Sequence, residues 1–467
     1  MCMKALHLIA LSVTAFLWFS VGPATAQQSR YPGKIWTKAA SPEAMGWSSS
    51  HLADARAFSK KIGSTAVMIV QHGVVVDEWG EVATKSPAHS VRKSLLSALI
   101  GIAVAEKKID LTDSMTDLGI DDNEPSLTDV EKQATVGDLI KARSGIYHAA
   151  LYESKGMTAS KPKRGSSAPG TLWHYNNWDF NALGTIYRQQ TGADIFEAFK
   201  HRIAVPLQMQ DYVPADGEYF TGAKSIHAAY PFRISARDLA RFALLYLRKG
   251  KWRGQQLVSE DWVATSTKSH SKIGPGRGYG YMWWTGYDSF RHLRTKAHYY
   301  FAAGYRRQYA FVFPHLDMVV IHRINSDTSK AFPPRYQIER LLWHIFAASG
   351  ETDIGPSQAI ETAIGEHLTD EGLQRTLSGA TLTGTNRKGK PYRLTLHEDG
   401  QLMRISGTNN ERRDQGNWHV ENGKYCRKYE KLFRGRELCF SVVKAENTLK
   451  MYDGLGTFIS DAVLAER

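Results

Sequence analysis

The sequence contains few cysteines, no internal repeats and no low-complexity tracts. Only 3 of its 467 residues are cysteine, and its 17 histidines show no spacing to cysteines or carboxylates that would suggest a zinc site. A glycine-rich phosphate loop is also absent from the sequence. Apart from one apolar run at the start, the chain lacks the long hydrophobic stretches of membrane-spanning proteins. These absences exclude fibrous, disordered and multi-span membrane proteins, and we expect neither a metal ion nor a cofactor.

The composition that remains is that of an ordinary globular protein with a basic charge balance. Hydrophobic residues make up 42% of the chain and charged residues 22%, so a chain of this length can bury a sizeable core without crosslinks. Its formal net charge is +13, from 59 Lys and Arg against 46 Asp and Glu. This excess favours contact with acidic surfaces such as nucleic acid, anionic lipid or cell-wall polymer, without choosing among them.

The first 26 residues have the features of an export signal. A short positive start at Lys4 precedes an almost wholly apolar run from Ala5 to Val21, and Ala24-Thr25-Ala26 then provides a small-x-small cleavage pattern. A membrane anchor is the alternative, but an apolar run of about 17 residues is at the short edge of a span. We therefore predict that residues 1–26 are removed and that the protein is periplasmic or secreted. Outside the cytoplasm, nucleic acid is not an expected partner.

Two cysteines, Cys426 and Cys439, remain after this cleavage. They lie in one short segment, and an oxidising compartment favours their pairing, so we predict a disulfide that closes a small loop. The same segment is rich in basic side chains: Lys424, Arg427, Lys428, Lys431, Arg434 and Arg436. Such a run usually forms a solvated face, and a weak contact with cell wall or membrane surface is its functional interpretation.

Hydrophobic periodicity predicts an α+β domain over residues 27–350. Strand patterns at 65–71 and 74–79 flank a His72-Gly73 hairpin signal. Further strand patterns occupy 297–302, 308–313 and 317–323. Helical patterns fall between and around these strands, at 48–62, 90–107, 135–143, 179–190, 235–249 and 334–348. The order of strands, helices and strands again fits a sheet with a helical cluster rather than alternating βαβ units.

The character of the sequence changes over residues 351–467. Short alternating runs are separated there by Gly, Asn and Asp turns, at 392–397, 402–405, 416–420, 438–443 and 448–452. This pattern predicts a small antiparallel β domain, a barrel or a sandwich.

The chemistry centres on Ser90-Val91-Arg92-Lys93, which opens a helix that is apolar nearly all round. A serine and a lysine three residues apart share one helix face, so the amine can reach the hydroxyl. A hydroxyl needs a base to become a nucleophile, and a desolvated lysine with a lowered pKa can serve as that base. The helix N-terminus also points N–H groups at a developing oxyanion. Because further Ser-x-x-Lys matches, such as Ser269/Lys272 and Ser441/Lys444, occur elsewhere, a simple N-cap serine is the competing interpretation.

The second motif is Tyr175-Asn176-Asn177, the only Tyr-x-Asn in the sequence. It follows a Pro169-Gly170-Thr171 turn and precedes a predicted helix. A tyrosine opposite a Ser/Lys pair can relay a proton to the leaving group, and the asparagine can hold the lysine and a substrate amide oxygen. An aromatic turn residue followed by a helix cap is the plainer alternative.

Together these segments resemble the serine β-lactamase and penicillin-binding-protein superfamily. Within it the chain is most similar to the class C-like hydrolases, a group that holds certain esterases and 6-aminohexanoate-dimer hydrolases. Further segments carry the resemblance across roughly residues 40–345: Ser144-Gly145-Ile146, Pro169–Asn177, Ile234–Arg241 and Tyr279–Trp284. The resemblance implies a helical cluster packed against an antiparallel sheet, with the nucleophile at their junction.

The resemblance also implies roles for individual residues. Ser90 would be the acylated nucleophile, Lys93 its base and Tyr175 the acid/base partner.

Substrate-binding residues follow from the same resemblance. Asn177 would orient the lysine and the substrate, and the oxyanion hole would combine the Ser90 N–H with a backbone N–H near Tyr305. Gly304 and Trp173 complete the set of residues that we expect at the substrate.

The third motif of the superfamily departs from its pattern. Penicillin-recognising members carry Lys or His, then Thr or Ser, then Gly, whereas Lys296 is followed here by Ala297-His298. Farther on, residues 305–309 resemble a Gly-Tyr-Gly-Gly-Gln pattern in which two arginines replace glycines. We therefore expect a small-molecule ester or amide as substrate rather than a penicillin. A cell-wall DD-peptidase, a β-lactamase and a catalytically silent binding protein are the alternatives, and the oligomeric state stays open.

Overall fold

The computed structural model describes residues 30–274, 276–286, 297–350, 363–385, 391–407, 412–435, 437–453 and 458–465. The predicted export signal, Lys296 and Arg436 lie outside the described residues. In the described part of the chain, no helix combines the length and apolar character needed to cross a bilayer.

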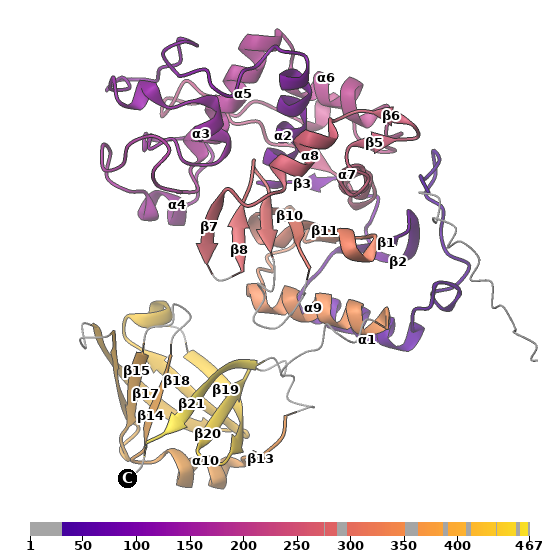
Figure 1. The fold of residues 1–467 in the computed structure, drawn as a ribbon. Helices are drawn as coiled ribbons and strands as arrows, with labels where there is room; N and C mark the ends of the chain where they lie inside the picture. Colours follow the sequence, from indigo (N-terminus) through magenta and orange to yellow (C-terminus); the bar gives the residue numbers. More distant parts are fainter. Residues whose placement is uncertain are drawn as a thin grey trace, which may run out of the picture.

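The first domain is built on an eight-stranded antiparallel sheet (Figure 1). The strand order is β2-β1-β12-β11-β10-β9-β8-β7. The strands are β1 (Ala66–Gln71), β2 (Val74–Gly80), β7 (Ser271–Gly274), β8 (Arg277–Tyr279), β9 (Trp284–Gly286), β10 (Tyr299–Gly304), β11 (Gln308–Phe313) and β12 (Met318–Arg323). All five strands predicted from periodicity are present, whereas β7, β8 and β9 are too short to give a periodic signal.

The hairpin between β1 and β2 shows how a local signal becomes structure. His72 and Gly73 both have positive φ, 53° and 76°, as a two-residue turn between twisted strands requires. A Cβ at Gly73 would lie 2.1 Å from the Arg30 carbonyl oxygen, so this position also needs the close approach that glycine permits.

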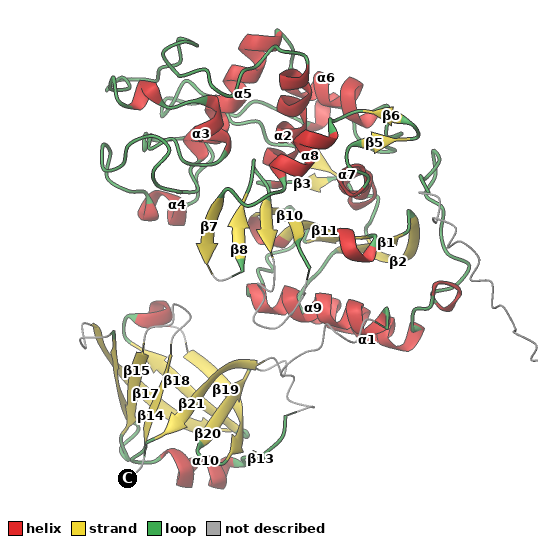
Figure 2. Ribbon diagram, viewed as in Figure 1, coloured by secondary structure: helices red, strands yellow, loops and turns green. Residues whose placement is uncertain are grey.

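Helices cover both faces of the sheet (Figure 2). One face packs against a cluster centred on α2, whose residues from position 91 to 103 are all buried. The other face packs against two helices that contact each other, α1 and α9. The helices are α1 (Ser49–Lys61), α2 (Val91–Ala105), α3 (Val136–Ile140), α4 (Lys155–Ser160), α5 (Asn177–Thr191), α6 (Ile195–Phe199), α7 (Ala236–Leu247), α8 (Glu260–Ser266) and α9 (Arg335–Ala348). Two short strand pairs, β3 (Ser86–Pro87) with β4 (Arg233–Ile234) and β5 (Lys251–Trp252) with β6 (Gln255–Gln256), connect these layers. The α+β prediction is confirmed.

The second domain is a closed eight-stranded antiparallel barrel (Figure 1). Each of the strands β14 to β21 pairs with the next one in sequence, and the pairing of β14 with β21 closes the ring. They are β14 (Thr381–Thr385), β15 (Pro391–Leu396), β16 (Gln401–Ser406), β17 (Arg412–Glu421), β18 (Lys424–Tyr429), β19 (Glu437–Ala445), β20 (Thr448–Tyr452) and β21 (Phe458–Leu464). A short strand β13 (Glu366–His367) pairs with β19, and helix α10 (Asp370–Leu377) adds leucines to the barrel core. The predicted small antiparallel β domain is thus present, as a barrel.

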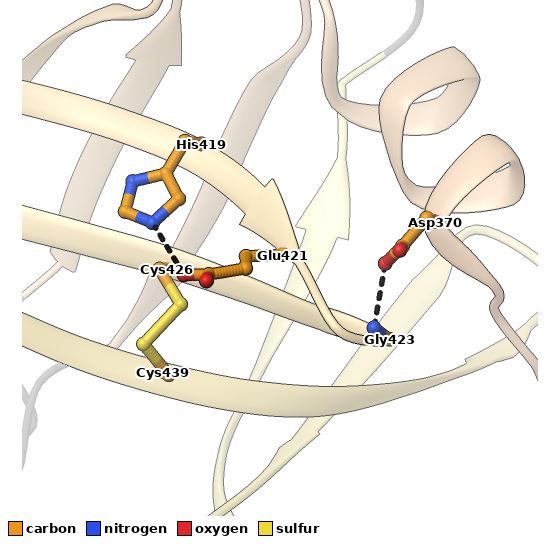
Figure 3. The surroundings of a disulfide bond; sticks show 6 residues. All are labelled: Asp370, His419, Glu421, Gly423, Cys426 and Cys439. Carbon is orange, nitrogen blue, oxygen red and sulfur yellow. Dashed lines mark hydrogen bonds and ion pairs between the residues drawn. A yellow bond between two sulfur atoms is a disulfide. The ribbon is translucent and has the colours of Figure 1, made fainter.

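The predicted disulfide is formed between Cys426 and Cys439 (Figure 3). The two residues are directly paired on the adjacent strands β18 and β19, with their Cα atoms 4.0 Å apart. Strand β18 was hidden from sequence reasoning by its charges. Alternation sends Arg427 into the barrel, where it is buried, and leaves Lys428 exposed, so the basic run does not form one continuous solvated face.

Candidate active site

Ser90 stands at the start of α2, close to the end of strand β10. It occupies the N-cap position, yet its side chain makes no capping hydrogen bond, which leaves the hydroxyl for other contacts. The preceding His89 has φ 49°, a left-handed conformation that is uncommon outside glycine. This turn presents Ser90 at the start of the helix rather than within it. The interpretation of Ser90 as a plain helix cap does not fit this geometry.

The structure brings together the three side chains that the motifs singled out. The Lys93 Nζ lies 2.9 Å from the Ser90 Oγ and 2.8 Å from the Tyr175 Oη. Lys93 is 1% exposed, and its spacing along α2 places it on the same face as Ser90. Tyr175 reaches the pair from the segment that leads into α5.

Burial and a neighbouring charge both act on the Lys93 amine. Complete burial lowers the pKa of Lys93 well below its usual value, and the adjacent Arg92 guanidinium lowers it further. The rings of Tyr175 and Phe180 lie 4.6 and 4.8 Å from the amine and favour its cation by about 2 kcal/mol or less each. No carboxylate forms an ion pair with Lys93 in the described parts of the chain, so the uncharged amine is favoured.

Arg92 is a buried guanidinium that lies between two aromatic rings. Its central carbon is 5.3 Å from the Tyr152 ring and 5.0 Å from the Tyr230 ring. Its nearest hydrogen-bond acceptors are the Asn181 side-chain oxygen at 3.4 Å and the His89 carbonyl oxygen at 3.5 Å. The sequence motif contained Arg92 without assigning it a role. A charged residue inside an otherwise apolar helix was the signal that could have identified it.

Tyr175 is enclosed by aromatic side chains. Its ring lies 5.0 Å from Phe180, 5.4 Å from Trp284 and 6.0 Å from Tyr279, between ring centroids. Burial raises the pKa of Tyr175 to about 12, so the phenol keeps its proton at neutral pH. Trp173 does not line the cavity described below. It packs behind this cage against Tyr279 and Trp284, and its expected place at the substrate stays a prediction.

A layer of hydrogen bonds holds the Tyr175 segment in place. Asn176 caps α5 by accepting from the Trp178 N–H, and it donates to the Ile146 carbonyl and to Asp179. Ser144 donates to Asp179 over 2.6 Å, and burial raises the pKa of that carboxyl well above its usual range. The Ser144-Gly145-Ile146 segment therefore positions the tyrosine without touching the reacting groups.

Asn177 lies in the cavity, but its observed partner is not Lys93. Its Nδ2 donates to the Tyr152 carbonyl over 2.6 Å. Its Oδ1 is buried and has no hydrogen-bond partner. Asn177 thus lines the cavity and does not support the lysine directly.

The end of β10 approaches the Ser90 turn closely. A Cβ at Gly304 would lie 2.6 Å from the Ala88 carbonyl oxygen, which explains why this position needs glycine. Both Ser90 and Tyr305 line the cavity. No backbone hydrogen bond between described residues uses the N–H of either one, so both donors remain available to an oxyanion.

Arg306 and Arg307 follow Tyr305 at the two positions where the superfamily pattern has glycines. The backbone there has the positive φ values that glycine adopts most easily. Arg306 and Arg307 have φ values of 55° and 65°. Arg306 donates to the Ser329 carbonyl and Arg307 donates to the Pro333 carbonyl over 2.7 Å. These bonds hold two left-handed residues that would otherwise be strained.

A cavity of about 1040 Å³ opens in front of Ser90 and Tyr175. The segments 150–154 and 220–224, the end of β10 and Trp284 form most of its wall. Three arginines also line it: Arg277, Arg307 and Arg335. Arg307 belongs to the arginine pair that follows Tyr305 in the sequence. Arg277 on β8 and Arg335 on α9 reach the cavity only through the tertiary structure. The described residues contain no group of three or more His, Cys, Asp or Glu arranged to hold a metal ion.

The fold and this site define a class of protein that the comparisons identify. The Beta-lactamase family model matches residues 50–342, and the chain belongs to this family. The protein is therefore a serine hydrolase of the β-lactamase and penicillin-binding-protein superfamily.

Three solved structures illustrate the structural similarity. The octameric penicillin-binding protein homologue from Pyrococcus abyssi is 16% identical with a TM-score of 0.51, over 89% of this chain and 99% of that one. A Bacillus anthracis protein provisionally named 6-aminohexanoate-dimer hydrolase is 20% identical with a TM-score of 0.49, over 64% and 82% of the two chains. A β-lactamase from Mycobacterium bovis is 17% identical with a TM-score of 0.45, over 63% and 99%. A comparison with curated proteins finds no significant match.

Proposed function

We propose that the protein cleaves an ester or amide bond through an acyl-enzyme formed on Ser90. The observation that carries this proposal is the position of the Lys93 amine, between the Ser90 hydroxyl and the Tyr175 phenol inside a buried aromatic cage. A lysine held there without its charge can accept a proton, whereas a protonated lysine cannot.

The first half of the reaction forms the acyl-enzyme. Lys93 takes the Ser90 proton as the Oγ attacks the substrate carbonyl carbon, and the carbonyl oxygen becomes an oxyanion. The free N–H groups of Ser90 and Tyr305 stabilise that oxyanion. Tyr175 passes a proton to the leaving alcohol or amine as its bond to the carbonyl carbon breaks, and the phenol regains a proton from Lys93.

The second half of the reaction releases the acid. A water molecule loses a proton to the Lys93–Tyr175 pair and attacks the acyl carbon, and Ser90 leaves with that proton restored to its Oγ. Asn177 lines the cavity and would contact the substrate there. We place this reaction in the periplasm or outside the cell, since the first 26 residues have the features of an export signal.

The absent third motif supports an ester or amide rather than a penicillin, and the cavity has room for a substrate of small-molecule size. A space of about 1040 Å³ is at the upper end of ordinary ligand pockets.

A contact of the exposed lysines of the barrel, such as Lys428 and Lys431, with anionic wall or membrane surfaces remains a secondary proposal.

Labelling with a fluorophosphonate probe tests the nucleophile. We expect the mature protein to be labelled at Ser90 and the Ser90→Ala variant to be unlabelled, with its turnover reduced by about 10⁴-fold or more. Ser269→Ala is the matched control, because Ser269 has the same spacing to a lysine but is exposed and far from α2 in the sequence. Labelling that persists in Ser90→Ala would contradict the assignment, and a folded wild type without any labelling would favour a silent binding protein.

A substrate panel separates the remaining activities. Short-chain esters, linear amide oligomers and a chromogenic cephalosporin would be compared on the same preparation. We expect turnover of esters or amides, and cephalosporin turnover above both would instead establish a β-lactamase.

A further inference from the structure

The cavity in front of Ser90 has an unbalanced charge. Among the described residues that line it, one is a carboxylate and four are cations. The carboxylate, Glu153, is already paired with Lys161, whose Nζ lies 2.8 Å from its Oε1. The excess positive charge plays no part in the transfer of protons between Lys93, Ser90 and Tyr175. The four cations are Lys224, Arg277, Arg307 and Arg335.

Two of the arginines lie beside one pair of aromatic rings. Trp284 on β9 and Phe301 on β10 are cross-strand partners, and their ring centroids are 6.5 Å apart. Arg277 on β8 pairs with Gly286, two residues from Trp284 along β9, so strand alternation places Arg277 on the same sheet face, diagonal to Trp284. The central guanidinium carbon of Arg335 on α9 lies 5.9 Å from the centroid of the Phe301 ring. Both arginines therefore border the part of the cavity that these rings line.

This part of the cavity adjoins the reacting groups. Trp284 stacks on the catalytic Tyr175, with 5.4 Å between ring centroids. Arg307 follows two residues after Tyr305, so their Cα atoms are at most about 7 Å apart. The Nε of Arg307 donates to the Pro333 carbonyl, just before α9 begins. A substrate whose carbonyl oxygen is held by the Tyr305 N–H can thus extend toward these arginines.

The protein neutralises this group of charges only in part. Arg335 forms an ion pair with Glu339 over 3.2 Å. In the described parts of the chain, neither Arg277 nor Arg307 forms an ion pair, and both side chains are only half-buried. Burial lowers the pKa of Arg277, and the charge of Arg335 lowers it further. Aromatic walls of low polarity strengthen the field of such a cluster, so an anion is attracted to it.

We propose that the substrate carries a carboxylate, remote from the bond that is cleaved, which binds to Arg277 and Arg307. The inference rests on the proposed hydrolysis and specifies its substrate class as an ester or amide with a free acid group. A carboxylate accepts paired N–H bonds from the planar fork of a guanidinium group. The hydrocarbon part of the substrate lies against Trp284 and Phe301, where its apolar surface leaves water.

Two matched pairs of esters test the proposal in the full mature chain. The carboxylate is in the acyl part of mono-4-nitrophenyl glutarate, and 4-nitrophenyl valerate is its neutral counterpart. The carboxylate is in the leaving group of 4-acetoxybenzoate, and 4-methylphenyl acetate is the counterpart. We expect the charged member of at least one pair to have a kcat/KM about tenfold or more above that of its neutral counterpart.

Arginine substitutions then assign the preference to this cluster. Arg277→Met and Arg307→Met should each lower the ratio of charged to neutral kcat/KM about tenfold, as the loss of a charge-assisted hydrogen bond does. Using the ratio removes any general effect on the catalytic groups, because both esters share it. Arg277→Lys should restore part of the ratio. The matched control is Lys272→Met, which removes an exposed cation of the neighbouring strand β7 and should keep the wild-type ratio.

The outcomes separate this inference from the proposed function. Ser90-dependent turnover with a ratio near one in both pairs, or a ratio unchanged in Arg277→Met, would overturn the inference and leave the hydrolase intact. If the wild type cleaves none of the esters, the proposed function fails. Calorimetric titration of Ser90→Ala with the two charged esters then decides the inference: binding that Arg277→Met weakens about tenfold supports the carboxylate site, and no binding refutes it. Should Arg307→Met fail to fold, Arg277→Met alone provides the comparison.

Discussion

At the scale of single residues, Arg92 and Lys93 form an unusual pair. They are consecutive in α2, both are buried, and no carboxylate of the described chain neutralises either one. The cost of two adjacent buried cations is relieved when the lysine loses its proton. The pKa of Lys93 is lowered by burial first and by Arg92 second. Arg92 thus helps to keep the amine uncharged without touching Ser90.

The pH dependence of turnover should report this arrangement. Activity needs uncharged Lys93, so it falls as the pH drops through the lowered pKa of that amine. Arg92→Met should raise the Lys93 pKa and move this acid limb to higher pH by roughly one unit or more, because it removes a neighbouring charge that disfavours the protonated amine. The measurement is the profile of kcat/KM against pH for an ester substrate.

A conservative variant separates charge from packing. Arg92→Lys keeps a cation at this position and should leave the acid limb close to that of the wild type. An acid limb that does not move in Arg92→Met, in protein with a wild-type circular dichroism spectrum, would exclude an electrostatic role for Arg92.

At the scale of elements, the turn between β10 and β11 is the most demanding segment near the site. Arg306 and Arg307 hold left-handed conformations that cost non-glycine residues roughly 1 kcal/mol or more each. The turn also carries the Tyr305 N–H that faces the cavity. Its backbone shape therefore matters more than the identity of the two side chains.

Two substitutions at Arg306 test this statement. Arg306→Gly adopts the same φ without strain and should retain kcat within about threefold, since it keeps the backbone donor in place. Arg306→Val cannot hold that conformation easily and should lower kcat about tenfold to a hundredfold through the displaced donor. Equal kcat values for the two variants in an ester assay would show that the turn does not position the oxyanion hole.

At the scale of the whole molecule, the chain has separate hydrophobic cores. The two cores of the α+β domain contain residues no later than Ala348, and the two cores of the C-terminal part contain residues from Ala363 onward. The disulfide belongs entirely to the barrel. Its loss should therefore destabilise the barrel and spare the hydrolase.

This separation predicts the effect of removing the disulfide. The two cysteines are 13 residues apart in the sequence. In the chain-entropy description, a crosslink that closes a loop of this size stabilises a fold by about 3 kcal/mol. Replacing Cys426 and Cys439 by serine should lower the free energy of unfolding of the barrel by up to about that amount, measured by urea denaturation followed by circular dichroism. Ester turnover and fluorophosphonate labelling should stay at wild-type levels, and a parallel loss of both would indicate one cooperative unit.

Much of the fold was predictable because its signals are local. The His72-Gly73 turn, the all-apolar helix after Ser90 and the alternating runs of the tail each follow from the conformational preferences of a few neighbouring residues. Strand β18 was missed because Arg427 lies on its inward face, where the alternating pattern of a strand has an apolar residue. The packing of Trp173 could not be predicted, because it depends on Trp284, over a hundred residues away.

The sequence by itself determined the pairing of Ser90 with Lys93, since residues three apart on a helix meet whatever surrounds the helix. Only the tertiary structure decided how closely Tyr175, from another segment, approaches that pair, and that Arg427 would be buried inside the barrel. The physical reason is the distance along the sequence over which the interactions act. Helix and turn geometry follow from bonds between neighbours, whereas burial, and with it every large pKa shift at the site, depends on which distant segments exclude water.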